Sequence, residues 1–466
     1  MAYKHYHFIG IGGIGMGTLA SLVLAQGSRV SGSDIKENEL TAKLKIQGAK
    51  IFIGHKPTNV SGADCVVYSS AIRMNNPEMI EAASRNIPIL RRAELLAKLV
   101  NSQTGITVAG AHGKTTTTSM ISNLLLHAGL QPSIAVGGII NNTGSSAQLG
   151  SGQYFVAEVD ESDGTFLYFN PAISVITNID FEHIDYYQTF EKILEAYSQF
   201  IGRTRKDGRL VVCGEDEQLR KLVQKQNIPA LFYGLSSQFD VYAKDINTRG
   251  YRSSFECFAQ GKKLGIIELN VPGKHNILNA MACVAVGLNL DIDFAIIQKS
   301  FKDFCGVKRR FQLKGEFDDI MVVDDYGHHP TEIEATLKAA HSFNKKRVVA
   351  VFQPHRYSRT KFLMDEFAKA LALSDYLILT DIYAASEKPI EGVSSQELLK
   401  KIVLRMSDKV IYLKKERILE HLLHVVQKGD LLITLGAGDV TTLSDEFVKE
   451  YRERVARDRS HREIIV

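Results

Sequence analysis

The chain contains no apolar run long enough to cross a membrane. The longest lies near Ala280–Leu288 and is far shorter than the roughly 20 residues that a membrane-spanning helix needs. The N-terminal segment MAYKHYHFIGIGG also lacks the apolar core and cleavage site of a secretory signal. We therefore expect a cytoplasmic protein that is not inserted in a membrane.

Cysteine is scarce, and its spacing offers no framework for a metal or a disulfide. The 466 residues include five cysteines, an odd number, and no two of them form a CxxC pair. Zinc ribbons and disulfide-stapled domains rely on such pairs. The five side chains are therefore expected to be reduced and mostly buried thiols. They are Cys65, Cys213, Cys257, Cys283 and Cys305.

The chain also lacks a large excess of positive or negative charge. The 56 basic residues almost balance the 52 acidic residues, which leaves a net charge of +4. Such a mild charge does not favour binding to nucleic acid. The most basic stretch, Lys449–Arg462, alternates in sign and is typical of a solvated helix face. With 45% hydrophobic and 23% charged residues, the composition is that of a globular protein and excludes general disorder.

The sequence does contain a repeated alternation of short apolar strands and helical segments, which predicts an α/β fold of three domains. Residues 1–103 predict an N-terminal Rossmann-like parallel sheet. Residues 104–311 predict a central P-loop-type mononucleotide-binding α/β domain, in which short strands between Leu210 and Val271 indicate an antiparallel edge. Residues 312–466 repeat strand, loop and helix, which predicts a C-terminal Rossmann-like α/β domain.

The first glycine-rich turn has the spacing GxGxxG. Gly10, Gly12 and Gly15 follow the expected strand His7–Ile11, and Asp34 ends the next strand. Glycines at these positions let backbone N–H groups approach a diphosphate at a helix N-terminus, and the acid can hold a sugar hydroxyl. The motif is typical of an NAD-dependent oxidoreductase, but a UDP-sugar also contains a diphosphate and a hydroxyl-bearing sugar. The motif alone therefore leaves both ligand classes open.

A second glycine-rich segment, VAGAHGKT at 108–115, matches the phosphate loop GxxxxGK[ST] except at Val108. In such a loop the backbone amides surround phosphate groups, Lys114 reaches the β- and γ-phosphates, and the Thr115 hydroxyl ligates Mg²⁺. The alternative is a glycine-rich turn with a solvated lysine. The position between a predicted strand and a predicted helix favours the phosphate loop.

Candidate metal ligands follow two further strands. The strand beginning at Tyr154 ends on Glu158, and the segment after it contains three more acids. Carboxylates this close repel one another without a cation, and Mg²⁺ prefers hard oxygen ligands. His183 follows the strand Ala172–Thr177 and is expected at the same edge of the sheet. The alternatives are an acidic surface loop and a structural histidine.

The C-terminal third carries two polar segments, each after a predicted strand. They are DDYGHHP at 324–330 and QPHRYSR at 353–359. Arg356 and Arg359 lie three positions apart at a helix start, where their guanidinium groups can fork onto a carboxylate. A pair of solvated surface arginines is the alternative. The two adjacent histidines have no closed set of zinc ligands around them in the sequence.

Taken together, these segments resemble the Mur ligase family over nearly the whole chain. The shared segments are HFIGIGGIGM at 7–16, LRRAELL at 90–96, AGAHGKTTTT at 109–118, VAEVDESDGTFL at 156–167, PGKHNILNA at 272–280, DDYGHHPTEI at 324–333 and QPHRYSRT at 353–360. Many separate motifs in one order make this a specific match. The resemblance implies one domain for a UDP-sugar, one for ATP and one for an amino acid, with boundaries at 1–103, 104–311 and 312–466.

The resemblance also implies which residues contact each ligand. For the UDP-sugar they are Gly12, Gly13, Gly15, Asp34, Ser70 and Ala71. For ATP they are Gly110, His112, Gly113, Lys114, Thr115, Thr116, Asn276, Asn279, Arg310 and Asp324. For the amino acid they are Tyr326, His328, Arg356 and Arg359. The implied catalytic residues are Lys114, Glu158 and His183, and the implied metal ligands are Thr115, Glu158 and His183.

The activity that the resemblance implies is ATP-dependent, ADP-forming synthesis of an amide bond. L-alanine would be joined to the lactyl carboxylate of UDP-N-acetylmuramate through an acyl phosphate, in peptidoglycan precursor synthesis and hence in cell shape and division. ATP and Mg²⁺ are the expected cofactors, and a monomer or a weak homodimer is expected. The segments GIGGIGM and LRRAELL favour this enzyme over the related ligase that attaches a whole tripeptide to the same UDP-sugar.

Two other classes of function were weighed against this one. An NAD-dependent oxidoreductase has no use for the phosphate loop with Lys114 or for the acids that follow Glu158. A regulatory nucleotide-binding protein without catalysis has no need for Lys114, Glu158 and His183 together. Both classes therefore explain less of the sequence than a ligase does.

Overall fold

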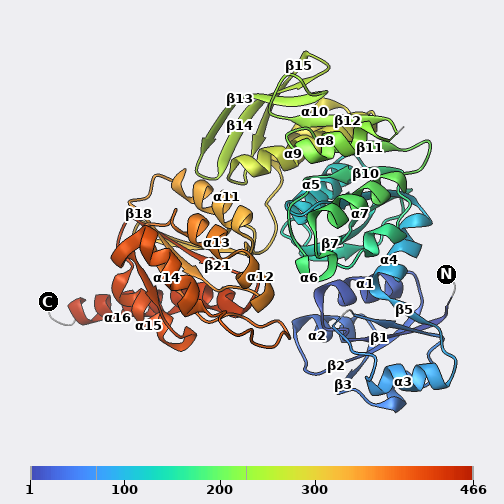
Figure 1. The fold of residues 1–466 in the computed structure, drawn as a ribbon, viewed down its shortest axis with the longest axis horizontal. Coiled ribbons are helices and arrows are strands. Elements are labelled where there is room, and N and C mark those ends of the chain that lie inside the picture. Colours follow the sequence, from blue (N-terminus) through green and yellow to red (C-terminus); the bar gives the residue numbers. More distant parts are fainter. Residues whose placement is uncertain (1–2, 70, 227, 464–466) are drawn as a thin grey trace. The chain divides into compact units, whose positions relative to one another are not determined.

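The computed structural model describes residues 3–69, 71–226 and 228–463. The chain forms two compact units. One contains the chain up to Asp245 with Phe255–Ile267 and Leu278–Cys305, and the other contains Ile246–Ser254, Glu268–Ile277 and the chain from Gly306 onward. Three sheets with covering helices confirm the expected α/β fold class (Figure 1). Within the described residues, no helix is long and apolar enough to cross a membrane.

The N-terminal sheet is parallel throughout and has the strand order β3-β2-β1-β4-β5. This order places the first strand in the middle, where loops from both halves of the sheet meet at its carboxyl end. The first strand ends two residues earlier than expected, because Gly10 has a φ of 80° and leaves the extended conformation. The strands are β1 His5–Ile9, β2 Arg29–Asp34, β3 Lys50–Ile53, β4 Cys65–Tyr68 and β5 Ile89–Arg91, and the helices are α1 Ile14–Ala25, α2 Glu39–Ile46, α3 Pro77–Ser84 and α4 Arg92–Asn101.

The central sheet has the order β15-β14-β13-β12-β11-β10-β6-β9-β7-β8. The strands from β12 through β7 pair in parallel, and β8 pairs antiparallel with β7. At the other end, two-residue connections join β13, β14 and β15, which is the length of a β-hairpin turn. The expected antiparallel edge is confirmed, although β11 and β12 within 210–271 are parallel.

The bounds of the central elements follow. The strands are β6 Thr104–Ala109, β7 Ser133–Ile140, β8 Ser145–Gln148, β9 Tyr154–Glu158, β10 Ile173–Ile176, β11 Arg209–Cys213, β12 Ala230–Gly234, β13 Val241–Arg249, β14 Arg252–Ala259 and β15 Lys262–Leu269. The helices are α5 Lys114–His127, α6 Ile184–Tyr187, α7 Phe190–Gly202, α8 Glu217–Gln224, α9 Lys274–Asn289 and α10 Phe294–Lys302.

The C-terminal sheet has the order β16-β17-β21-β18-β19-β20, and only β16 is antiparallel to its neighbour. Successive residues of β18 alternate between two separate cores. One core includes helices α11, α13 and α14, and the other includes α15 and α16. Because both faces are covered, the inner strands β17, β21, β18 and β19 are largely apolar, which is why the sequence shows continuous apolar runs there.

The bounds of the C-terminal elements complete the fold. The strands are β16 Gln312–Phe317, β17 Ile320–Asp325, β18 Arg347–Phe352, β19 Tyr376–Leu379, β20 Val410–Tyr412 and β21 Asp430–Leu435. The helices are α11 Pro330–His341, α12 Tyr357–Phe362, α13 Met364–Leu371, α14 Ser395–Met406, α15 Lys415–Val425 and α16 Thr442–Glu463.

A buried carboxylate ties helix α3 to the first two strands of the N-terminal sheet. Glu78 is fully buried, and its Oε2 accepts a 2.5 Å hydrogen bond from the Ser33 hydroxyl. Its Oε1 accepts a 2.5 Å bond from the Asn59 amide, and His7 Nε2 lies 3.5 Å from Oε2. Burial by itself would raise the pKa of Glu78, but these hydrogen bonds outweigh it and lower the pKa to about 2. The network fixes the strand residue that precedes Asp34.

We predict that Glu78→Gln lowers the free energy of unfolding at pH 7 by about 2 kcal/mol, because a charged acceptor is lost from a buried network. The ionised carboxylate stabilises the fold above its ordinary pKa of 4.5, and this contribution is lost as the pH falls from 4.5 towards 2. Urea unfolding at pH 7 and pH 3 should therefore show a smaller difference between wild type and variant at pH 3. Glu81→Gln on the same helix, where the side chain is partly exposed, is the control. An equal difference at both pH values would contradict the assignment.

Candidate functional site

The loop between β6 and α5 wraps around its own lysine. Lys114 Nζ donates hydrogen bonds to the carbonyl oxygens of Gly110 (2.6 Å) and Ala111 (3.2 Å). It also donates to both carboxylate oxygens of Glu161, at 2.8 and 2.9 Å. Gly113 precedes the helix with a φ of 81°, and a Cβ there would lie 2.5 Å from Asn279 Oδ1. Glycine is therefore required at position 113 both for its conformation and for space.

Glu161 joins the lysine to the histidine that the sequence singled out. Its side chain is almost completely buried, and His183 Nε2 lies 3.4 Å from Oε1. Burial opposes a positive charge on Lys114, but Glu161 and Asp160 outweigh it and raise the pKa of Lys114. Burial likewise disfavours a charged His183, but the hydrogen bond with Glu161 and the charge of Glu182 raise the pKa of that imidazole. The cluster therefore places the Lys114 ammonium group and the His183 imidazole on one carboxylate.

Of the three implied metal ligands, Thr115 and Glu158 are in contact, and His183 lies with other carboxylates. Thr115 Oγ1 donates a 3.0 Å hydrogen bond to Glu158 Oε1, and the Gly137 N–H donates to Glu158 Oε2 at 2.7 Å. Hydroxyl and carboxylate oxygens are the hard ligands that Mg²⁺ prefers, so the pair fits that ion. A second group, Asp160, Glu161 and His183, offers ligand atoms within 4.8 Å of one another. His183 thus lies with Asp160 and Glu161, a grouping that the sequence left open.

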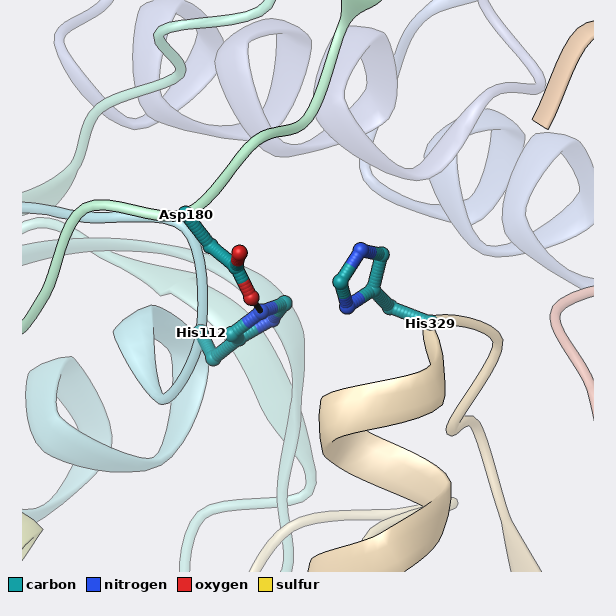
Figure 2. A group of neighbouring side chains, drawn as sticks. All are labelled: His112, Asp180 and His329. Carbon is teal, nitrogen blue, oxygen red and sulfur yellow. Dashed lines mark hydrogen bonds and ion pairs between the residues drawn. The ribbon is translucent and has the colours of Figure 1, made fainter. Parts of the chain in front are cut away.

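The end of strand β10 anchors the phosphate loop. The His112 N–H donates to Asn178 Oδ1 (2.9 Å), and the Thr177 hydroxyl donates to the His112 carbonyl (2.6 Å). Figure 2 shows the His112 ring beside Asp180, with 2.8 Å between His112 Nε2 and the Asp180 carboxylate. Figure 2 also draws His329, which caps helix α11 in the other compact unit. Asn178 and Asp180 were not predicted as site residues. Their position in the segment just after β10 was the available signal.

Asn276 and Asn279, the two asparagines expected at ATP, have different surroundings. Asn279 Oδ1 accepts a 3.1 Å hydrogen bond from the Thr117 hydroxyl on α5, so it lies beside the phosphate loop. Asn276 Nδ2 donates to the Pro272 carbonyl at 2.7 Å and closes the turn before α9. Thr116, also expected at ATP, is buried in the first turn of α5.

The glycine-rich turn of the N-terminal sheet is held by Asp34. The Gly12 N–H donates a 2.8 Å hydrogen bond to Asp34 Oδ2, and the Asn38 amide donates to the Gly12 carbonyl at 3.0 Å. Helix α1 begins after Gly13, and no side chain caps it. The Ala71 N–H donates to Ser69 Oγ at 3.3 Å. Ser70, the other residue expected in this segment, lies outside the described residues.

The residues expected to receive an amino acid gather in the C-terminal sheet. The ring of His328 lies 5.2 Å from that of Tyr326, between centroids. The Arg359 guanidinium donates to the His355 carbonyl at 3.3 Å, and the Arg356 N–H donates to the Tyr383 carbonyl at 2.9 Å. Arg356 has a φ of 72°, which is strained for a residue with a side chain. The structure therefore brings these residues to the carboxyl ends of β17 and β18.

Two aromatic residues of this cluster were missed by the sequence analysis. His355 lies 5.7 Å from the His328 ring and stacks on Tyr383 with centroids 5.6 Å apart. Burial, followed by the charges of His328 and the neighbouring arginines, lowers the pKa of His355 to about 3, so its ring is neutral at physiological pH. The signal for His355 was its place beside Arg356 after a strand. Tyr383 has no comparable signal.

The two adjacent aspartates at the end of β17 play different parts. Asp324 is fully buried and accepts 2.7 Å hydrogen bonds from the hydroxyls of Thr434 and Thr441. Asp325, which was not predicted, accepts 2.7 Å bonds from the N–H groups of Phe311 and Gly327. The Arg310 guanidinium lies over the Tyr326 ring, 5.1 Å from its centroid. Asp324 thus lies buried between the two threonine hydroxyls and the Arg309 guanidinium, whose Nε is 3.3 Å away, and Asp325 holds the polar loop in place.

Comparison with known proteins matches three family models along the chain. The Mur ligase family catalytic domain matches residues 5–104, and the Mur ligase middle domain matches residues 108–287. The Mur ligase glutamate ligase domain matches residues 309–438. The three matches follow one another in the order of the three sheets.

Individual relatives match over almost their full length. One from Geotalea uraniireducens, named UDP-N-acetylmuramate--L-alanine ligase, is 48% identical and covers 96% of this chain and 98% of its own. One of the same name from Aquifex aeolicus is 46% identical, with 96% and 98% covered. The crystal structure of a UDP-N-acetylmuramate-alanine ligase from Thermotoga maritima has a TM-score of 0.82 at 30% identity, covering 97% of this chain and 100% of that chain. A murein peptide ligase from Psychrobacter arcticus shares the fold, with a TM-score of 0.73 at 23% identity and 96% and 98% covered. This chain belongs to the Mur ligase family.

Proposed function

We propose that this chain is an ATP-dependent ligase that joins L-alanine to the lactyl carboxylate of UDP-N-acetylmuramate, with release of ADP and phosphate. The observation that carries the proposal is the likeness, at 48% identity over 96% of the chain, to a ligase named for these two substrates. The product belongs to peptidoglycan precursor synthesis, and we place the reaction in the cytoplasm. The geometry of the phosphate loop and of the C-terminal arginine cluster is compatible with this chemistry.

The three sheets divide the substrates among them in this proposal. Residues 1–103 bind the UDP-sugar, residues 104–311 bind ATP, and residues 312–466 bind L-alanine. The bounds of the three matching family models, which fall near 104 and 309, support this division. The UDP-sugar residues, the phosphate loop and the amino-acid residues follow parallel strands, where α/β sheets bind ligands, whereas Asn276 and Asn279 are on α9 and Arg310 precedes β16.

The proposed reaction has two steps. A carboxylate is a poor electrophile, so the lactyl carboxylate first attacks the γ-phosphate of ATP and forms an acyl phosphate and ADP. The alanine amine then attacks the acyl carbon, and inorganic phosphate leaves. Lys114 neutralises charge on the phosphoryl group as it meets the carboxylate, because two anions otherwise repel each other.

Mg²⁺ fits the oxygen ligands of this site. Thr115 and Glu158 would hold the ion, and His183 lies beside two further carboxylates that can complete a second position. The bound ion supplies positive charge next to the phosphates. The chain's own contribution is to keep Glu158 aimed at Thr115 through the Gly137 N–H.

The runner-up is the ligase that attaches a whole tripeptide to the same UDP-sugar. We predict that the purified protein forms ADP from ATP and UDP-N-acetylmuramate when L-alanine is added. Glycine and L-serine should support slower turnover, and the tripeptide should support none. The measurement is coupled ADP release with each acceptor offered in turn. ADP formation that depends on the tripeptide alone would establish the runner-up instead.

We predict that Lys114→Ala lowers ADP formation by at least about 100-fold, because the developing charge on the γ-phosphoryl group loses its cation. The same assay at saturating substrates measures this loss. Lys221→Ala is the control, since that lysine is on the exposed face of α8 and pairs only with Glu217 among the described residues. Wild-type turnover by the Lys114 variant would rule out the phosphate-loop assignment.

We predict that Arg356→Lys raises the KM for L-alanine by about tenfold and leaves the KM for UDP-N-acetylmuramate unchanged. A lysine keeps the charge but cannot form two parallel hydrogen bonds to a carboxylate. Steady-state kinetics with each substrate varied in turn provide the test. Arg405→Lys, at an exposed position of α14, serves as the control. An equal rise in both KM values would remove Arg356 from the alanine site.

A further inference from the structure

Arg92 lies against the glycine-rich turn of the N-terminal sheet. It is the first residue of α4, and its helix packs against α1. A Cβ built on Gly15 would lie 3.2 Å from Arg92 Cδ and 3.2 Å from a guanidinium nitrogen. The guanidinium therefore covers the first turn of α1, and the absence of a side chain at Gly15 makes room for it.

The guanidinium of Arg92 forms no hydrogen bond or ion pair with any residue that the structure describes. Its neighbour Arg91 is different, because it donates a 3.3 Å hydrogen bond to the Tyr68 hydroxyl. The charge of Arg92 lowers the pKa of Asp160, but its effect is smaller than the effects of Lys114 and His183. The five donors of this half-buried guanidinium are therefore available to water or to a ligand.

The surroundings of Arg92 indicate the charge and shape of that ligand. The first turn of α1 has no side-chain cap and no acidic residue. Neither its first N–H groups nor the positive end of its helix dipole is therefore paired with an acidic side chain of that turn. Gly13 is exposed and leaves its backbone open to approach, whereas Asp34 and Asn38 lie beside Gly12 and Arg92 lies beside Gly15. The nearby carboxylate, Asp34, is engaged with the Gly12 N–H. Backbone donors and a guanidinium together suit a group with several anionic oxygens.

We propose that Arg92 binds the diphosphate of the UDP-sugar and fixes it on the first turn of α1. This inference rests on the proposed function and adds a charged side chain to a site that otherwise offers backbone N–H groups. Arginine is suited to this role because its planar fork can bond two phosphate oxygens at once. Both oxygens of Asp34 accept backbone hydrogen bonds, from Gly12 and Ile35, so the cationic side chain of this site is Arg92.

The test compares UDP with uridine as ligands of the full chain. We expect Arg92→Gln to weaken UDP binding about 10- to 100-fold. This is the loss in affinity that corresponds to the free energy of one hydrogen bond to a charged group. Uridine, which has no phosphate, should bind both proteins within about twofold. Arg92→Lys should lie between them, because it keeps the charge without the fork. Calorimetry measures UDP, and ligand-observed NMR measures uridine.

Arg85→Gln is the matched control, because this arginine is exposed on α3 in the same sheet and pairs with Glu81. It should bind UDP like wild type, and all variants should melt at similar temperatures. Equal UDP affinity in wild type and Arg92→Gln would overturn the role of Arg92 alone. An equal loss of UDP and uridine would also overturn it, since the side chain would then only support the fold. Failure of the wild-type protein to bind UDP would overturn the proposed function itself.

Discussion

The buried ammonium group of Lys114 is the interaction on which the candidate nucleotide site depends. A charge removed from water costs several kcal/mol unless it is paired, and here Glu161 and two loop carbonyls supply the partners. The loop must curl to bring those carbonyls inward, and Gly113 must take a positive φ to start the helix. Phosphate oxygens are the same kind of partner as a carboxylate. In the proposed reaction, phosphate oxygens would take the place of that carboxylate beside Lys114.

The candidate residues gather because parallel strands end on one edge of a sheet. In the central sheet the neighbours β10, β6 and β9 lead directly into the segments with Asn178, Lys114 and Glu158. In the C-terminal sheet, β17 and β18 lead into Tyr326 and His355 in the same way. Each strand returns through a helix, so polar loops accumulate at one edge while both faces of the sheet stay apolar. This geometry explains why separate motifs can form one cluster.

Much of this arrangement could be predicted from local patterns. The alternation of apolar runs with helices gave the fold class, and the strands at Lys50–Ile53 and Cys65–Tyr68 have the expected bounds. Thr115 and Glu158 were expected at one edge of the sheet because each follows a predicted strand, and they lie in contact there. The parallel pairing of β11 and β12 was not expected, since short strands with turns look alike in sequence whichever way they pair.

The sequence by itself predicted the chemistry proposed for this chain: a diphosphate turn, a phosphate loop, acids for Mg²⁺ and two arginines for a carboxylate. Those signals are local, because glycine spacing and strand-end positions are set by a few neighbouring residues. Only the tertiary structure decided which groups share a partner. It placed His183 on Glu161, His355 between His328 and Tyr383, and Arg92 over Gly15. These contacts join residues distant in the chain, and their formation depends on how the strands are ordered and how the helices pack.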